Sequence, residues 1–447
     1  MDGNLILNKL KKLKDVNSMK DVKPLTNYLF PGKHCPLMGA ALAVRGIKDA
    51  MMVVIGTDEC AYYTKSMAMT EAFGGVNGRC VSVVIDTNDV TFGSVEKVER
   101  AFVEIIDEYE PSCVFLVTTC VIEIIGDDFD ALADNLTDEY NIPIMAVHTE
   151  HFKSEDHMPG VERTMTACVD MMEKQADNQK DGSVNVLGQR LGDFTETELY
   201  DIFQENNIKI GLMLPSGCDM SEIKMASKAS VNIVVHGTAL PLAKKMKKKF
   251  GTPYVLFERM ANPERTKARY KELFEFLDIE LPTELDAKYK EAVLKVQEGR
   301  EKLKDIGYIY GNTPYRGFEI NEFMCDLGMK PLLLQISELT QEDLDYKKSI
   351  EAKHNPPVSV SANISPLQYV YDVTKPHLYL GHEYVMRLRK KQIAMVRSDS
   401  ANSLLGYETT IFLVDELIRA TEEATELREN PNAMPKNMPM MGMGMMG

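Results

Sequence analysis

The sequence has no apolar run of the roughly 18 to 20 residues that a membrane-spanning helix requires. Its opening, MDGNLILNKLKKLKD, lacks the apolar stretch and small-residue cleavage site of a secretory signal. Positive charge is in deficit, because 67 acidic residues face 51 basic ones and the net charge is −16. Nucleic-acid binding needs a basic footprint, which this composition does not supply. We therefore expect a cytoplasmic protein with no membrane and no nucleic-acid partner.

Two kinds of motif are also missing. No cysteines are paired as C-x₂-C, the local spacing typical of zinc sites, and a disulfide framework is not expected among eight cysteines without a secretory signal. No G-x-x-x-x-G-K-[ST] phosphate loop occurs, and Gly74-Gly75-Val76-Asn77-Gly78 is only a glycine cluster. If the reaction is driven by ATP, hydrolysis must occur on another protein.

What the sequence does contain is an alternation of short β-branched runs with helical patterns, which is typical of parallel α/β sheets. At 447 residues the chain is too long for a single core. We expect three Rossmann-like, doubly wound domains with mostly parallel sheets, followed by a flexible tail rich in methionine and glycine. The expected domains are 1–182, 183–304 and 305–430, with a disordered tail at 431–447. In the first domain the predicted strands are 51–55, 81–86, 113–117 and 142–147, and the predicted helices include 94–109 and 128–140.

Three cysteines stand where chemistry is expected in such a fold. Ligands bind beyond the carboxyl ends of the strands in open α/β sheets. Cys60 follows the first predicted strand through Gly56-Thr57-Asp58-Glu59, and Cys120 follows the third through Thr118-Thr119. Cys35 precedes Pro36 at a predicted helix N-terminus, where the helix dipole favours the thiolate. Three isolated thiolates on strand-end loops suit an iron–sulfur cluster better than zinc.

The other cysteines have different surroundings. Cys80 and Cys113 begin apolar strands, and Cys168 and Cys325 fall in amphipathic helices, so we interpret these four as core residues. Cys218 lies in the loop Pro215-Ser216-Gly217-Cys218-Asp219, between a predicted strand and helix. Its thiol could either fill the core or face a cleft.

The local sequences around the three cysteines are more specific than the spacing of the cysteines. The segments KHCPLMGAALAVRGI, GTDECAYYTKS, TFGSVEKVERA, VTTCVIEIIGDDF and IPIMAVHTEHFKSEDHMPG occur in this order. Together they resemble the first domain of component 1 of the nitrogenase-like oxidoreductases, most closely its β-type subunit. The resemblance continues more faintly through VNIVVHGTALPLAKKMKKKFGTPY and GYETTIFLVDELI.

The resemblance implies a cofactor and its ligands. In this family the three first-domain cysteines bind a four-iron or P-type cluster at a subunit interface, and this role falls on Cys35, Cys60 and Cys120. One chain offers three thiolates, so a second component 1 subunit, identical or homologous, must complete the cluster. Ser154 matches a serine near the oxidised cluster of β-type subunits, although the local spacing differs by one residue. His148, His151 and His157 crowd the same segment and could bind metal or belong to an interface loop.

The chain also departs from the family pattern. Catalytic α-type subunits hold a heterometal cofactor with one cysteine and one histidine, where this chain reads Val234-Val235-His236-Gly237 and Val396-Arg397-Ser398-Asp399. A molybdenum-type cofactor held in the usual way is therefore not expected. His236 could face a central cleft, or could be a satisfied structural residue. With Cys218 it is the candidate for a catalytic role.

Two functional hypotheses follow from the resemblance. The first is a subunit of a nitrogenase-like reductase, which receives electrons from an ATP-dependent iron-protein reductase and delivers them to a substrate in the interdomain cleft. The second is a scaffold that carries metal precursors for the assembly of a cofactor.

Overall fold

The structure is a computed structural model that describes residues 2–25, 34–68, 79–154, 156–174, 180–311, 313–360 and 364–430. The glycine cluster at 74–78 and the expected tail at 431–447 lie outside these residues. None of the helices in the described segments combines the length and apolar character that a membrane crossing requires.

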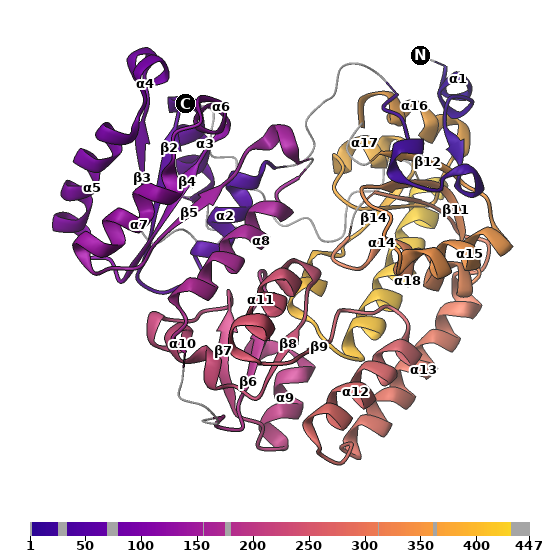
Figure 1. Ribbon diagram of the computed structural model, residues 1–447. Helices are drawn as coiled ribbons and strands as arrows, with labels where there is room; N and C mark the ends of the chain where they lie inside the picture. Colours follow the sequence, from indigo (N-terminus) through magenta and orange to yellow (C-terminus); the bar gives the residue numbers. More distant parts are fainter. Residues whose placement is uncertain are drawn as a thin grey trace. The chain divides into compact units, whose positions relative to one another are not determined.

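The chain divides into two compact units. One comprises residues 31–289 together with 402–408, and the other comprises 1–30, 290–401 and 409–447. The 31–289 unit holds two four-stranded sheets, and the other unit holds one six-stranded sheet (Figure 1). Nearly all strand pairs are parallel, so the predicted doubly wound, Rossmann-like α/β architecture is confirmed.

The first sheet has the strand order β3-β2-β4-β5, and every neighbouring pair is parallel. Its central strand β2 is buried along its whole length, as expected for a strand covered by helices on both faces. The sheet consists of β2 (Ala50–Gly56), β3 (Cys80–Val84), β4 (Cys113–Thr118) and β5 (Ile144–His148). Its helices are α2 (Pro36–Val44), α3 (Asp58–Ala68), α4 (Thr87–Phe92), α5 (Val95–Tyr109), α6 (Cys120–Ile125), α7 (Phe129–Tyr140) and α8 (Met158–Ala167).

Side chains alternate between the two faces of this sheet. Met51 and Val53 of β2 pack with residues of α5 and α7, such as Phe102. Met52 and Val54 belong to the core on the opposite face, with residues of α2 and α8. The second core also contains Leu187, Leu212 and Val234 of the second sheet, so one apolar layer joins the two sheets. This shared core fixes the first sheet against the second.

The second sheet has the order β7-β6-β8-β9 and is entirely parallel. Because the strands are parallel, the loops after them all emerge at one edge. The elements are β6 (Val184–Leu187), β7 (Ile210–Leu214), β8 (Val231–Val234), β9 (Tyr254–Leu256), α9 (Glu198–Glu205), α10 (Met220–Met225), α11 (Leu240–Phe250) and α12 (Pro263–Leu277). The division of the chain between the two units falls after Tyr289, within α13 (Glu284–Lys302).

The remaining unit contains the third sheet, in the order β1-β12-β11-β10-β13-β14. Its first strand, β1 (Lys11–Lys12), pairs antiparallel with β12, so the N-terminal segment completes the last sheet. The expectation that residues 1–30 belong with the first sheet is therefore wrong, because two lysines carry no pattern that identifies a strand. The other predicted boundaries, after residues 182 and 304, stay predictions. The elements are α1 (Gly3–Leu7), β10 (Gly307–Tyr310), α14 (Gly317–Asp326), β11 (Lys330–Ile336), α15 (Asp343–Lys353), β12 (Pro357–Val360), α16 (Ile364–Thr374), β13 (Leu378–Leu380), α17 (Val385–Lys390), β14 (Ala394–Val396) and α18 (Glu408–Glu429).

Candidate metal centre

The three predicted cluster cysteines each stand at the start of a helix. Cys60 lies in the first turn of α3, two residues after Asp58 begins that helix, and Cys120 is the first residue of α6. Cys35 is the N-cap residue of α2, followed by Pro36. A helix N-terminus presents backbone N–H groups and a partial positive charge, both of which favour a thiolate over a neutral thiol.

The fold brings these three loops to one edge of the first sheet. β2 and β4 are parallel neighbours, with Ile55 opposite Thr118, so the loops that carry Cys60 and Cys120 leave the sheet side by side. The three thiols are close enough for their charges to interact: thiolates at Cys60 and Cys120 raise the pKa of Cys35. All three side chains are half-buried. A convergence of sulfur atoms, expected from the sequence, is thus present in the geometry.

Burial opposes ionisation of the Cys35 and Cys60 thiols when no metal is bound. Desolvation raises the pKa of Cys35, although the backbone N–H groups of Met38 and Leu37 act in the opposite direction. Desolvation also raises the pKa of Cys60, against hydrogen bonds from the hydroxyl groups of Thr57 and Thr119. A bound cation would reverse this balance, because metal coordination deprotonates thiols.

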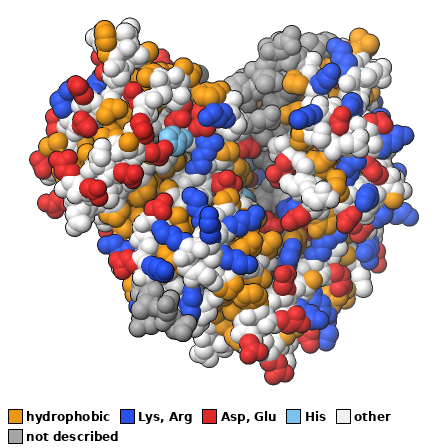
Figure 2. All heavy atoms as spheres, in the orientation of Figure 1, with side chains coloured by type: hydrophobic (Ala, Val, Ile, Leu, Met, Phe, Trp, Pro, Cys, Tyr) orange, Lys and Arg blue, Asp and Glu red, His pale blue; other side chains and the backbone are white. Residues whose placement is uncertain are grey.

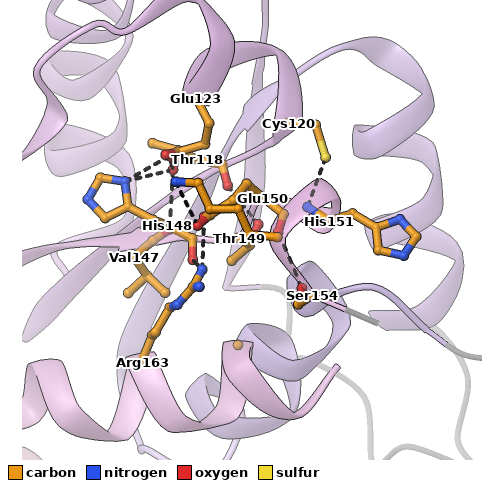
Figure 3. Close-up of polar contacts among 12 residues, drawn as sticks. Thr118, Cys120, Glu123, Val147, His148, Thr149, Glu150, His151, Ser154 and Arg163 are labelled. Atoms are coloured by element: carbon orange, nitrogen blue, oxygen red, sulfur yellow. Dashed lines mark hydrogen bonds and ion pairs between the residues drawn. The ribbon is translucent and has the colours of Figure 1, made fainter. Parts of the chain in front are cut away.

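The loop after β5 covers the Cys120 thiol. The backbone N–H of His151 donates a hydrogen bond to Cys120 Sγ, with an N to S distance of 3.2 Å (Figure 3). Ser154 lies at the end of the same loop, where its Oγ donates to the carbonyl oxygen of Glu150 at 3.3 Å. Arg163 of α8 anchors the loop by donating to the His148 carbonyl oxygen at 2.6 Å and to Glu150 Oε2 at 2.8 Å. The loop that carries Ser154 is therefore braced by Arg163 and contacts the Cys120 thiol.

The donor set fits an extended cluster better than a single ion. Within the part of the chain that the structure describes, no three His, Cys, Asp or Glu side chains converge on one ion. An iron–sulfur core is wider than an ion, so its thiolate ligands stand further apart while remaining neighbours. The hydroxyl of Thr119, adjacent to Cys120, is buried without a partner in full hydrogen-bonding geometry. The Thr119 hydroxyl lies near enough to Cys60 to lower the pKa of its thiol. A thiolate at Cys60 would therefore be a suitable hydrogen-bond acceptor for this hydroxyl.

His148 is held by two carboxylates next to this site. Its Nδ1 contacts Glu123 Oε1 at 2.7 Å and its Nε2 contacts Asp130 Oδ2 at 3.2 Å. Burial favours the neutral imidazole, but the two carboxylates outweigh burial and raise the pKa of His148. Figure 3 shows the ring on the far side of the loop from Cys120. These contacts connect β5 to α6 and α7. Metal binding by His148, the predicted alternative, is not supported, because no third ligand lies near it among the described residues.

Cys218 lies in the core. Its side chain is fully buried, and its backbone N–H and carbonyl bond to Gly46 and Lys48 across an isolated parallel bridge. Desolvation is the largest cause of its raised pKa, and the charge of Cys113 adds to it. Cys168 lies close enough to interact with both thiols. This environment favours the core alternative for Cys218 over a catalytic thiol.

His236 stands directly beyond the end of β8. Its Nδ1 accepts a hydrogen bond from the backbone N–H of Thr238 at 3.2 Å and caps a short 3₁₀ turn. Burial is the main cause that lowers its pKa well below the ordinary value, and the charges of Arg190 and Arg259 lower it further. His236 is therefore a neutral imidazole at physiological pH, with Nε2 as the protonated nitrogen.

The edge of the first sheet that carries Cys35, Cys60 and Cys120 is called the thiol edge below. Helices at this edge expose large apolar side chains, which the sequence patterns did not predict. Phe92, the last residue of α4, is 86% exposed, Tyr62 of α3 is 74% exposed and Ile124 of α6 is 73% exposed. All three helices follow strands of the first sheet at the same edge as the cysteines. None of these three side chains belongs to a recognisable sequence motif, so only the folded arrangement reveals that they face solvent.

The fold and this edge define a class: a parallel α/β protein with clustered thiols beyond the strands of its first sheet. The family model for nitrogenase component 1 type oxidoreductases matches residues 35–422. The chain belongs to this family, and the resemblance stated from its motifs is confirmed.

Several curated relatives are similar over most of the chain. The nitrogenase iron-molybdenum cofactor biosynthesis protein NifE of Rippkaea orientalis is 26% identical over 69% of this chain and 67% of its own length. NifE of Clostridium pasteurianum is 27% identical over 71% of each chain. The nitrogenase molybdenum-iron protein alpha chain of Methanosarcina barkeri is 25% identical over 72% of this chain and 63% of its own length. The particular likeness to β-type subunits stays a prediction from the motifs.

A solved structure shares the fold. Nitrogenase Cp1 at pH 6.5 superposes with a TM-score of 0.78 at 17% identity, over 91% of this chain and 95% of the other. Agreement at this level of identity establishes the shared architecture.

Proposed function

We propose that this chain is a subunit of a nitrogenase-like reductase that binds an iron–sulfur cluster through Cys35, Cys60 and Cys120. The observation that carries the proposal is the gathering of three half-buried thiols, each at a helix N-terminus, from loops far apart in the sequence. When bound, the cluster supplies one-electron transfer. The residues of the chain hold it, shield it and bring their own hydrogen bonds to its sulfur ligands.

The cluster is shared with a second component 1 subunit, identical or homologous. Three thiolates from one chain leave a four-iron cluster with an incomplete ligand set. One ligand from a partner would complete a four-iron cluster, and three would allow a larger P-type core. Exposed Tyr62 and Ile124 near the thiol edge support the presence of a protein partner there, because large apolar side chains gathered in one exposed region are typical of interfaces.

Electrons reach the cluster from an ATP-dependent iron-protein reductase that docks transiently. The sequence has no phosphate loop of its own, so the energy of ATP hydrolysis enters through that partner. From the cluster, electrons pass to a substrate in the interdomain cleft. His236, a neutral imidazole at the carboxyl edge of the second sheet with its Nδ1 occupied by Thr238, would donate a hydrogen bond from Nε2 to such a ligand.

The second candidate is a scaffold for the assembly of a metal cofactor, and the relatives favour it. NifE proteins, which carry the name of cofactor biosynthesis proteins, match this chain over about two thirds or more of their length. A scaffold and a reductase subunit would use the same thiol edge. They differ in what happens to the metal after it binds.

One experiment tests the cluster assignment. Anaerobically purified chain should contain iron and sulfide and show a dithionite-dependent EPR signal, and Cys120→Ala should lose most of the iron. Cys168→Ala removes a thiol that is fully buried in the core and is the matched control, so its iron content should equal that of the wild type. Full iron retention by Cys120→Ala would refute the assignment.

A second measurement separates the two candidates. The cognate reductase and MgATP are added to the iron-loaded chain, and the EPR signal is followed. Repeated oxidation and reduction in the presence of a substrate supports the reductase subunit. Net transfer of iron to another protein, without turnover, supports the scaffold.

A further inference from the structure

Helix α11 concentrates positive charge on an acidic chain. Its sequence, LPLAKKMKKKF, contains five lysines and no acidic residue, while the whole chain has a net charge of −16. Figure 2 shows Lys and Arg side chains gathered over this helix. All five lysines are exposed, and together they are called the lysine face: Lys244, Lys245, Lys247, Lys248 and Lys249. The lysine face is therefore a local reversal of the charge of the chain.

The lysines of this face repel each other. Lys244 and Lys248 are four residues apart, as are Lys245 and Lys249, and like charges at this spacing destabilise a helix. Asp170 offsets part of the repulsion, since its Oδ1 lies 3.2 Å from Lys249 Nζ. Within the part of the chain that the structure describes, the side chains of Lys244, Lys245 and Lys248 form no hydrogen bond or ion pair. Three of the five charges are thus available to a partner.

The next two helices in the sequence carry charges of both signs. In α13, Lys295 and Lys302 both pair with Glu298, at 2.7 Å and 2.8 Å. In α12, Arg269 pairs with Glu272 at 3.0 Å. A solvated helix face typically combines both signs in this way. α11 departs from this pattern, so solvation alone does not account for the lysine face.

The opposite face of α11 is buried. Leu242, Ala243 and Met246 are fully buried and belong to the core that joins the first and second sheets. A helix that binds a membrane surface needs an apolar face that can enter the lipid, and the apolar face of α11 is already covered by protein. The lysine face is therefore a set of charges on a fixed support, and it does not have the character of a lipid anchor.

The size of the lysine face fits a protein surface better than nucleic acid. Eleven helical residues extend about 16 Å, and lysines four residues apart are separated by about 6 Å along the axis. Nucleic-acid binding commonly uses about 6 to 10 phosphate contacts over a longer basic footprint. A spacing of about 6 Å matches carboxylates at i and i+4 of an acidic helix. A second copy of this chain could reach the lysine face only with a different surface, and such a contact leads to rings or open filaments.

We propose that the lysine face of α11 is a docking site for an acidic surface of a different protein, whose carboxylates pair with Lys244, Lys245 and Lys248. The rest of the chain repels an acidic partner, so the lysine face determines where that partner binds and accelerates its association. This docking site goes beyond the proposed function and is compatible with a reductase subunit and with a scaffold.

The partner is first captured by photo-crosslinking in the cells that produce this chain. The full chain carries p-benzoylphenylalanine in place of Lys245. The matched control carries it in place of Lys271, an exposed lysine of α12 that pairs with Glu275. The adduct specific to position 245 should be a protein of acidic composition. Adducts with only nucleic acid, lipid or a second copy of this chain would overturn the proposal, as would a yield no higher than that of the control.

Association kinetics of the captured and purified protein then test the charges. At about 0.05 M salt, the triple variant Lys244→Gln/Lys245→Gln/Lys248→Gln should associate about tenfold or more slowly than the wild type. At about 0.3 M salt this difference should largely disappear, because the charges are screened. The control variant, Lys271→Gln/Lys290→Gln/Lys304→Gln, removes the same number of exposed charges elsewhere and should associate as the wild type does.

Stability and iron content distinguish docking from a structural role. Glutamine has a helix propensity close to that of lysine and relieves the repulsion, so the triple variant of α11 should be at least as stable as the control variant and hold as much iron. A Tm well below that of the control variant would identify the lysines as structural and overturn the proposal. Equal association rates of the wild type and the triple variant of α11, or rates that do not change with salt, would also overturn it.

Discussion

Gly56, the last residue of β2, lies against the threonine that precedes Cys120. A Cβ at Gly56 would stand 2.2 Å from Thr119 Oγ1 and 2.8 Å from its Cγ2. Both groups are deeply buried, so neither can move aside without displacing the backbone between β4 and α6. A single hydrogen atom at Gly56 thus allows two of the cysteine loops to approach each other.

Gly56→Ala should therefore destabilise the chain by about 1 to 3 kcal/mol, the usual cost of overpacking, and should lower its iron content. Urea unfolding measures the first effect and iron analysis the second. Adding Thr119→Ala removes the two closest clashing atoms, so the double variant should be more stable than the sum of the single changes predicts. Strict additivity would contradict this account.

At the residue scale, the sequence identified Cys60 and Cys120 because loops after parallel strands must emerge at one edge, and Cys35 because it precedes Pro36 at a helix N-terminus. The sequence left open whether Cys218 fills the core or faces a cleft, since both are common after a strand. The bridge to residues 46–48 favours the core, and this bridge is visible only in the fold.

At the scale of elements, His148 connects β5 to α6 and α7 through Glu123 and Asp130. The raised pKa of His148 means that its contribution to stability is fully present below the ordinary value of 6.5 and is lost as pH rises through the raised value. Because the side chain is 36% exposed, we expect at most about 1 kcal/mol.

Thermal unfolding measured from about pH 5.5 to about pH 8.5 checks this expectation. The stability difference between the wild type and His148→Gln should shrink toward the alkaline end. His354 is the control, since burial lowers its pKa and gives its contribution the opposite sign. A difference for His148→Gln that grows with pH would refute the assigned ion pairs.

Helix α4 presents Phe92 to solvent on a short, well-anchored element. Asp86 caps its start by accepting from the N–H groups of Asn88 and Asp89, and Gly93 ends it with a φ of +96°. Lys97 holds Asp89 at 2.6 Å. An exposed aromatic side chain on a rigid support loses little entropy when a partner covers it, which is a property of interface anchors.

Phe92→Ala should therefore weaken functional docking of the reductase by about tenfold, seen as a higher KM for the reductase in ATP-dependent reduction of the cluster. Direct reduction by dithionite should be unchanged. Leu294→Ala on α13 provides the control, because Leu294 is also largely exposed, at 64%, and belongs to the other unit. An unaltered KM for Phe92→Ala would exclude this surface from reductase docking.

Most elements of the first sheet agree with their sequence patterns within a few residues. The run 113–117 became β4 (Cys113–Thr118), and the helix expected at 128–140 became α7 (Phe129–Tyr140). The prediction at 81–86 ran past β3, which ends at Val84, because Ile85 is apolar and buried but lies outside the ladder. α4 was missed, since its mostly polar residues Thr87 to Thr91 look like a loop until the cap at Asp86 is recognised.

At the scale of the whole molecule, the incomplete ligand set predicts an assembly that depends on its metal. Chain purified anaerobically from cells should have a native mass equal to two component 1 type subunits, and the mass will show whether the second is identical or homologous. Removal of iron with a chelator should shift the complex toward single subunits. An iron-loaded chain that stays monomeric at every concentration would contradict the shared cluster.

The pairing of β1 with β12 has a consequence for biosynthesis. Lys11 leaves the ribosome 347 residues before Val358, its partner in the third sheet. At translation rates of about 5 to 20 residues per second, the segment that carries β1 waits roughly 20 to 70 seconds for the strand beside it. During that interval residues 31–289 are synthesised and can form their two sheets, so the thiol edge can be assembled before β1 pairs with β12.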